Sequence, residues 1–404
     1  MTSIRLVSIT HPCLGGMVGS KRLDFLSDAE ITILSRYEEA GAIAATGTVR
    51  RISMPTSGRD RKARFPSLAA ALNLLAPDVV HLHADPDTSL ALQVARLCGA
   101  QTGRGLVLET EMSPTGAGQG WAAALRSRQT LLRTSAVVAR NASALASLRR
   151  IGFSGLGLIA GRGLEPQSLP DTDDALRLLQ IQPGRQPVIG WAGPLDTKSH
   201  VSDLLEAIAL CEREVIVIIP ATGPFYQDVL DRADALEILH RVRFVAPEHS
   251  GAVMDERPDL SAFPTMIAAV DALLVSPPSS ALDRACSLRS VEFAHIHSIP
   301  VIHSGLRDIA DLIGDGGWQV PFGDPALLAR LFDALTARPR LLAQATAAAS
   351  NNAQTRHSPE AAAAGLARAI TAASIAASGA SSRLDSRKTR GSLALAPHRQ
   401  PGST

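Results

Sequence analysis

Short apolar runs alternate with longer stretches in which apolar residues recur every three or four positions, along most of the chain. The short runs are typical of buried strands, and the longer stretches are typical of helices with one apolar face. In the first half they predict strands at residues 4–9, 79–82, 105–108, 136–139 and 156–159, and helices at 67–75, 88–98, 125–133 and 141–150. Such alternation predicts a parallel sheet covered by helices on both faces.

The second half repeats this pattern after a change in composition. Residues 166–187 hold four prolines and an acidic cluster, as is typical of a connection between domains. Beyond it, strands are predicted at 188–191, 215–219, 242–245, 272–275 and 301–303, with helices at 201–211, 226–235, 265–270, 288–296 and 325–337. The pattern therefore predicts two doubly wound parallel-sheet domains in tandem.

The predicted boundaries follow from these changes in composition. We expect a first domain at 1–168, a linker at 169–186 and a second domain at 187–345. Alanine-rich helices follow at 346–380, with a break near Ser358 and Pro359, and residues 381–404 form a basic tail that we expect to be disordered. Open α/β sheets bind ligands at the carboxyl ends of their strands, so we expect the site in a cleft between the two domains.

Composition and charge exclude several classes of function. The 404 residues are 46% hydrophobic and 19% charged, which is enough for two buried cores. Aromatic residues make up only 3% and the net charge is +2, so a dedicated nucleic-acid binder is not expected. The charge is unevenly spread, because residues 1–165 carry an excess of seven basic side chains and residues 166–380 an excess of nine acidic ones.

The cysteines and the termini indicate a cytoplasmic protein. The four cysteines, Cys13, Cys98, Cys211 and Cys286, lie far apart, without the spacing of a zinc site or a disulfide framework. The N-terminus does not resemble a secretion signal, and no uninterrupted apolar run reaches the roughly 18 residues of a membrane span. A peripheral contact with an anionic membrane remains an alternative, through the basic stretch formed by Arg50, Arg51, Arg59, Arg61, Lys62 and Arg64.

Several motifs follow one another in an order that resembles a known family. They are the glycines Gly15 and Gly16 after the first strand, the segment 77–83 (PDVVHLH), the segments 131–139 and 145–152, the segment 189–195 (IGWAGPL) with Lys198, the segments 242–244 and 272–277, and 291–302. Over roughly residues 1–345 this order resembles the family 4 (group 1) retaining glycosyltransferases. The resemblance implies the GT-B fold, with an acceptor-side domain first and a nucleotide-sugar donor domain second.

The resemblance also implies which residues bind the donor. Lys198 precedes a predicted helix, where an ammonium can reach a diphosphate, and Glu292 would begin a helix and accept the ribose hydroxyls. The family's glycine turns correspond to Gly15, Gly16, Gly193 and the pair Thr222 and Gly223. A solvated lysine, a helix-start acid that complements the helix dipole and a plain strand-to-helix turn are the alternatives for these positions.

Three positions depart from the family pattern. Pro194 stands where the family has an arginine, Arg284 stands where it has the first of two glutamates, and Glu111 or Met112 stands where it has a histidine. We expect Arg284 to replace the missing cation on the diphosphate, and Glu111 to contact a sugar hydroxyl or accept the acceptor's proton. The alternative is that catalysis has been lost and that binding remains.

The expected function is retaining transfer of a hexose from a nucleotide-sugar to a glycan, lipid-linked or small-molecule acceptor, without a metal or other cofactor. An inactive relative that binds a sugar nucleotide or a partner protein is the second hypothesis. A third is a metallohydrolase, because residues 81–87 (HLHADPD) resemble a zinc signature. In the plainer interpretation of that segment, Asp85 or Asp87 caps the next helix.

Overall fold

The structure is a computed structural model that divides into two compact units. It describes residues 3–11, 20–36, 49–99, 102–111, 120–184, 186–193, 195, 198–248, 260–277 and 281–393, without the side chains of 20–21, 60, 198–200, 281–285 and 380–393. The first unit comprises Met1–Ala139, Ala144–Ile159 and Ala363–Thr404, and the second comprises Arg140–Ser143 and Ala160–Ala362.

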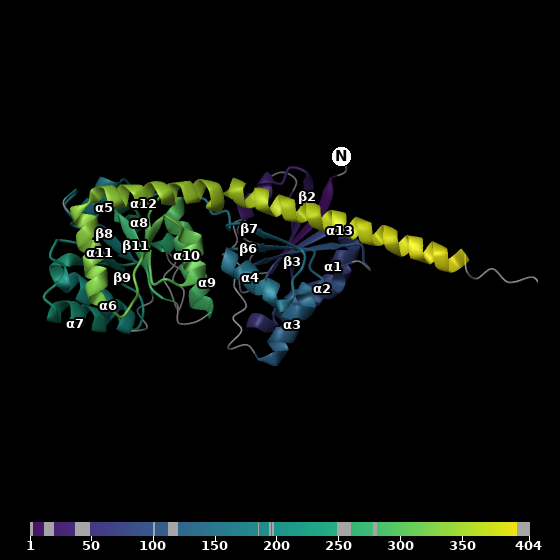
Figure 1. The fold of residues 1–404 in the computed structure, drawn as a ribbon, viewed down its shortest axis with the longest axis horizontal. Coiled ribbons are helices and arrows are strands. Elements are labelled where there is room, and N and C mark those ends of the chain that lie inside the picture. Colours follow the sequence, from purple (N-terminus) through teal and green to yellow (C-terminus); the bar gives the residue numbers. More distant parts are fainter. Residues whose placement is uncertain are drawn as a thin grey trace, which may run out of the picture. The chain divides into compact units, whose positions relative to one another are not determined.

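A seven-stranded parallel sheet forms the centre of the first unit (Figure 1). Its strands are β1 (Ile4–Thr10), β2 (Ala29–Arg36), β3 (Val49–Met54), β4 (Val79–His83), β5 (Gly105–Thr110), β6 (Ala136–Ala139) and β7 (Leu156–Ile159), in the order β3-β2-β1-β4-β5-β6-β7. Because the order reverses between β1 and β4, the unit is doubly wound.

One face of this sheet is apolar. Val7 and Ile9, Val80 and Leu82, and Leu106 and Leu108 alternate along their strands and join one core. The helices that bury this face are α1 (Leu68–Leu75), α2 (Ser89–Leu97) and α4 (Ala142–Ile151), with α3 (Trp121–Leu131) packed against α2.

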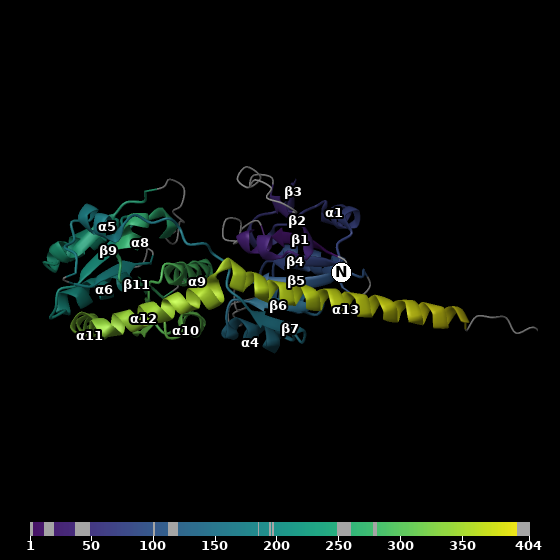
Figure 2. The same cartoon turned by 90° about the horizontal axis from the view of Figure 1, so that it is seen from above.

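The other face is covered by a helix from the far end of the chain. The first part of helix α13 (Pro359–Leu393) lies along this face and the rest extends past the sheet, as both views show (Figures 1 and 2), with Leu366, Ala369, Ile370, Ala373 and Ala377 buried. A Cβ at Gly105 of β5 would lie 2.5 Å from the Ala373 carbonyl oxygen, so the helix approaches the strand closely only because Gly105 has no side chain.

A six-stranded parallel sheet forms the second unit. Its strands are β8 (Val188–Trp191), β9 (Ile216–Pro220), β10 (Val242–Val245), β11 (Ala272–Val275), β12 (Val301–His303) and β13 (Gly317–Gln319), in the order β10-β9-β8-β11-β12-β13. Alternating residues of β8, β9 and β11 face two separate apolar cores. One core holds α5 (Thr172–Leu178), α8 (Pro264–Ala269), α9 (Ala281–Ile296) and α10 (Arg307–Ile313), and the other holds α6 (Lys198–Leu210), α7 (Tyr226–Ala235) and α11 (Pro325–Ala337).

The C-terminal helices continue from α11. Helix α12 (Pro339–Asn352) is followed by one turn of π-helix, η7 (Ala353–His357), and then by α13. The break at Ser358 follows from Pro359, which disfavours helical backbone in the residue before it. By length and composition, the stretch Pro339–Gly379 is long and apolar enough to cross a membrane. Of its apolar 18-residue segment, 39% is buried within the protein. Core helices of soluble proteins meet the same criterion.

The predicted fold class is confirmed, while several elements differ from prediction. The sequence pattern missed β2, β3, β13, α5 and α10, and α9 begins seven residues earlier than predicted. Helix α5 lies inside the segment that we expected to be a linker, where Asp171 caps it by accepting from the Asp173 amide. Helix α13 reaches Leu393, beyond residue 381 where we expected disorder, because no proline interrupts residues 360–393.

Candidate functional site

The strand order of the second unit places its candidate ligand site. The order reverses between β8 and β11, and open α/β sheets bind ligands where the carboxyl ends of such neighbouring strands diverge. Helix α6 follows β8 and begins at Lys198, and α9 follows β11 and carries Arg284 in its first turn. The backbone therefore brings Lys198 and Arg284 to the first turns of the two helices that flank the reversal point.

Glycine allows the loops at this edge to meet. A Cβ at Gly193, just after β8, would collide with the Trp191 ring and lie 2.7 Å from Oγ of Ser276, which follows β11. Gly223, after β9, has a φ of +109°, and a Cβ there would lie 3.1 Å from the Leu195 side chain. Gly193 and Gly223 are therefore positions where close approach excludes a side chain, as expected of a turn that holds a ligand with its amides.

Several predicted site residues are not among the residues that the structure describes. Gly15, Gly16, Pro194 and Met112 are not among the described residues, and the backbone of Lys198 and Arg284 is described without the side chains. Lys198 was expected in a loop before a helix that begins at Val201, whereas it is the first residue of α6. Thr222 is partly buried, and its amide donates to the Pro220 carbonyl at 2.8 Å.

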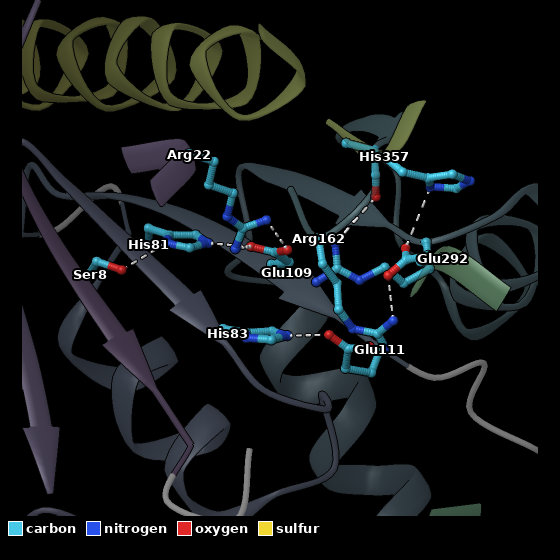
Figure 3. A network of polar contacts seen from close by, with 11 residues as sticks. Ser8, Arg22, His81, His83, Glu109, Glu111, Arg162, Glu292 and His357 are labelled. Carbon is cyan, nitrogen blue, oxygen red and sulfur yellow. Dashed lines mark hydrogen bonds and ion pairs between the residues drawn. The ribbon is translucent and has the colours of Figure 1, made fainter. Parts of the chain in front are cut away.

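Glu292 is not at the start of a helix, so that prediction was wrong. It lies eleven residues into α9, about 16 Å along the axis at 1.5 Å per residue. Its fully buried carboxylate accepts from Nη1 of Arg162 at 2.5 Å, and its Oε1 lies 3.9 Å from Nδ1 of His357 (Figure 3). Glu292 Oε1 has no hydrogen-bond partner in the described part of the chain. The ribose role remains a prediction, and the partner that the structure gives Glu292 is Arg162.

His357, near the Glu292 carboxylate, and His295, whose ring lies 5.5 Å from that of His357, are both neutral. Burial lowers the pKa of His295 to about 3, and His357 adds to the effect. With its Nε2 protonated, His295 donates to the Gly316 carbonyl at 3.3 Å. Burial likewise lowers the pKa of His357, against the opposing effect of the Glu292 charge. Arg162 is therefore the only described cation within hydrogen-bond distance of Glu292.

In the first unit, polar side chains gather on the sheet face opposite the apolar core. His81 and His83 alternate with Val80 and Leu82 along β4, so both histidines point to the same face. His83 Nε2 lies 2.7 Å from Oε1 of Glu111, and both residues are buried (Figure 3). The structure thus places the predicted Glu111 in a buried pair with a histidine that sequence reasoning did not assign to it.

A second buried network lies two residues earlier along the chain, at His81 and Glu109. Glu109 accepts two bonds of 2.6 Å from Arg22 of η2 (Ser20–Phe25), and it lies 2.8 Å from Nε2 of His81. Burial lowers the pKa of His81, so the ring is neutral, donates through Nε2 and accepts the Ser8 hydroxyl at Nδ1 over 3.0 Å. The groups are those of a hydrolase triad, but Ser8 is 4% exposed, so the network positions β1, β4 and β5 rather than attacking a substrate.

Asp85, just beyond β4, is the titratable group at this edge with a pKa near neutrality. Burial, together with the charges of Asp87 and Glu111, raises the pKa of Asp85 to about 6. Arg61 opposes them from 3.5 Å, and the Thr110 hydroxyl donates to Asp85 at 2.9 Å. A carboxyl group with a pKa raised to about 6 is suited to move a proton, so Asp85 joins Glu111 as a candidate.

The HLHADPD segment does not form a metal site among the described residues. There, no group of three or more histidine, cysteine, aspartate or glutamate side chains could hold a metal ion. His81 and His83 instead bind Glu109 and Glu111 separately. The helix-cap interpretation is corrected as well, because Thr88 caps α2 by accepting from the Ala91 amide at 3.2 Å.

The spacing of the histidines and glutamates in the sequence could have predicted these two networks. His81 and His83 are two apart in β4, and Glu109 of β5 and Glu111, just after it, are also two apart, beside runs of apolar residues. Residues two apart share a sheet face, so two neighbouring strands with this pattern bring acids and histidines together. Arg22 had no such signal, because it comes from an irregular segment.

Comparison with solved structures identifies the fold. The chain is similar to HepE from Anabaena in complex with UDP, with 16% identity, a TM-score of 0.62, and coverage of 91% of this chain and 99% of that one. A glycosyltransferase from Rickettsia africae gives 12% identity, a TM-score of 0.65, and coverage of 92% and 99%. The chain has the GT-B fold.

A third neighbour with the GT-B fold is a sucrose-phosphate synthase. Sucrose-phosphate synthase from Thermosynechococcus elongatus gives 13% identity and a TM-score of 0.61 and covers 90% of this chain and 98% of its own. No family model and no curated protein matches the chain by sequence. At these identities the likeness shows the GT-B fold alone.

Proposed function

We propose that this GT-B protein is a glycosyltransferase that moves a hexose from a nucleotide-sugar to a glycan, lipid-linked or small-molecule acceptor with retention of configuration. The observation that carries the proposal is the reversal point between β8 and β11, where α6 and α9 begin with Lys198 and Arg284 in their first turns. Structures of HepE with UDP, with UDP and glucose, and with UDP-glucose show that a GT-B neighbour binds such donors.

The chemistry requires positive charge near the leaving diphosphate. Helix N-termini present free amides and a positive dipole end, and α6 and α9 supply two of them at the same sheet edge. Lys198 and Arg284 would add full charges, and a guanidinium can hold two phosphate oxygens at once. Charge placed where the diphosphate leaves lowers the barrier as an oxyanion hole does, so we propose a reaction that needs no metal cofactor.

For the retaining reaction we propose that the acceptor attacks the face from which the diphosphate leaves. Little is then asked of a protein base, because an oxygen of the leaving group removes the acceptor's proton. Glu111, held by His83, is our candidate for contact with a sugar hydroxyl or for accepting that proton. Asp85, with its pKa near 6, is the alternative proton acceptor on the same unit.

One observation favours the second hypothesis, a relative that binds without catalysis. Glu292 and Glu111, the two carboxylates assigned to sugar contacts, are both buried and already engaged, by Arg162 and His83 respectively. A chain that had lost transfer would keep such pairs for stability alone. Binding of a nucleotide-sugar without turnover distinguishes this hypothesis from the first.

The test is a panel of UDP-, GDP-, ADP- and TDP-sugars, scored for thermal stabilisation and for slow donor hydrolysis. At about 100 times its dissociation constant, a bound donor adds about 2.7 kcal/mol to stability. We expect one donor to stabilise the protein and to be hydrolysed, with both effects lost in Lys198→Ala and Arg284→Ala. Arg330→Ala is the matched control, since Arg330 is exposed on α11 and bonds only within its own helix.

The outcomes separate the hypotheses. Stabilisation without hydrolysis, with a full set of acceptors also tried, favours the binding protein. If no donor stabilises the wild type, the proposal that a nucleotide-sugar binds at the reversal point between β8 and β11 is wrong.

A further inference from the structure

Helix α3 exposes its apolar side chains. Trp121, Leu125 and Leu132, its C-cap residue, are 81%, 47% and 66% exposed. With the exposed Arg128 they follow the spacing i, i+4, i+7 and i+11, which places all four on one stripe of the helix. A tryptophan with most of its surface in water is an uncommon choice unless another surface covers it.

The buried side of α3 holds two small polar residues, Ser127 and Thr130, and one apolar residue, Leu131. Ser127 and Thr130 are fully buried, and their hydroxyl oxygens have no hydrogen-bond partner among the described residues. This side packs against α2 within the first unit (Figure 1). Three of the four large apolar side chains of α3 and its C-cap are therefore exposed and only Leu131 is buried, which departs from the usual arrangement of an amphipathic helix on a soluble protein.

The sequence around α3 is also purely basic. Residues 120–139 contain three arginines, Arg126, Arg128 and Arg133, and no aspartate or glutamate. Arg128 lies on the exposed stripe, and the exposed Arg133 follows it in the next turn. Tryptophan and leucine with arginine beside them are the residues that place a helix in the plane of an anionic membrane surface.

We propose that the exposed face of α3, formed by Trp121, Leu125, Arg128 and Leu132, docks the protein on an anionic lipid bilayer. The apolar side chains would enter the boundary between headgroups and acyl chains, while Arg128 and Arg133 contact the headgroup phosphates. A second copy of the chain is a poorer occupant, because its own basic face would repel this one. The inference is independent of the proposed function, since docking requires no nucleotide-sugar.

The structure also argues against the basic stretch as the membrane contact. Arg61 pairs with Asp85 and Asp87, and Arg50 lies 3.5 Å from Glu30. These acidic neighbours offset the charge that a lipid surface would attract. The stretch also contains no aromatic side chain between residues 50 and 64 that could anchor it.

The experiment is cosedimentation of the full chain with phosphatidylcholine vesicles that contain or lack phosphatidylglycerol. We expect binding only to the anionic vesicles, with a loss of affinity as salt rises. Trp121→Ser with Leu125→Ser, and separately Arg128→Gln with Arg133→Gln, should each weaken binding about tenfold. Fluorescence of the wild type should shift to the blue on vesicles, because Trp191 is fully buried and Trp318 partly so, which leaves Trp121 as the responsive indole.

Two control variants make the test specific to this face. Leu74→Ser removes another apolar side chain, 86% exposed on α1, and should leave binding unchanged. Arg59→Gln with Arg64→Gln removes two exposed charges of the basic stretch and should also leave it unchanged. Circular dichroism of each variant checks that it is folded, as expected for exposed positions.

Several results would contradict docking through α3. The proposal is overturned if the wild type ignores anionic vesicles, if the α3 variants bind as the wild type does, or if only the basic-stretch variant loses binding. Self-association that the α3 variants abolish, without vesicle binding, would assign the face to a second copy instead. Each outcome can be read whether or not the protein transfers sugar.

Discussion

The Arg162–Glu292 pair shows how a buried charge constrains the interpretation of a single residue. Both side chains are fully buried, and removing one partner would take away the opposite charge that the other pairs with in the interior. A role in ribose binding and a role in stability therefore make different predictions for the same substitution. The pair lies in the second unit, where Arg162 belongs to the segment that enters it from β7.

Substitution of Glu292 should mainly affect stability. We expect Glu292→Ala to lower the free energy of unfolding by about 3–5 kcal/mol, because the buried Arg162 guanidinium loses its carboxylate partner. Arg162→Met with Glu292→Met should be less harmful than the sum of the two single substitutions. Urea denaturation measures both. A Glu292→Ala protein of wild-type stability that no longer binds a donor would instead support the ribose role.

Three buried histidines make stability depend on pH. Burial lowers the pKa of His11 and of His303 to about 4, and that of His295 to about 3, from 6.5. The unfolded chain therefore binds protons first, so the stability that these residues contribute is full above pH 6.5 and is lost as pH falls towards 4 and 3. Asp85 acts in the opposite direction, because its raised pKa lets the folded state bind a proton between pH 6 and 3.8.

We predict that thermal stability falls as the pH is lowered from 6.5 to 4, since three histidines outweigh one aspartate. His295→Gln should make this decline shallower, because the amide can keep the bond to the Gly316 carbonyl and does not titrate in this range. The exposed His240→Gln is the matched control and should leave the slope unchanged. A wild-type unfolding temperature that stays constant over this range would contradict the burial argument.

At the scale of elements, the sequence pattern predicted most of the apolar strands, but it missed β2, which is buried over residues 31–34, and two strands with weak apolar runs. Strands β4, β5 and β6 are buried throughout and were predicted at nearly the observed bounds. Strand β3 (VRRISM) carries charges on a short edge strand, and β13 has three residues, so neither has a clear apolar run. Helix α10 is only seven residues long, which is too short for a periodic signal.

The contact between α13 and β5 gives a prediction at the same scale. In Gly105→Ala the new Cβ would lie 2.5 Å from the Ala373 carbonyl oxygen, so α13 must move away from the sheet. We expect a loss of about 1–3 kcal/mol, typical of overpacking, and faster proteolysis within α13. Gly379→Ala, on α13 where an added Cβ meets nothing within 4 Å, should be neutral or slightly stabilising. Equal effects of both substitutions would contradict the close packing.

At the scale of the whole molecule, the order of motifs carried more information than any single motif. Alternating strands and helices on either side of residues 166–187 predicted two doubly wound sheets, and the GT-B neighbours confirm that fold class. The candidate site was less predictable. Pairs such as His83 with Glu111 and Arg162 with Glu292 join residues 28 and 130 positions apart, and only the folded chain shows which partner each charge has.

The central claim is that a nucleoside diphosphate binds where β8 and β11 diverge, between the first turns of α6 and α9. Calorimetric titration of the wild type, Lys198→Ala and the Arg330→Ala control with the nucleoside diphosphate of the best donor tests it most directly. A charge-assisted bond to phosphate contributes about 1.5–3 kcal/mol, so we predict binding about 10- to 150-fold weaker in Lys198→Ala and unchanged in the control. Equal affinity in all three proteins would show that the diphosphate binds elsewhere and would contradict the account.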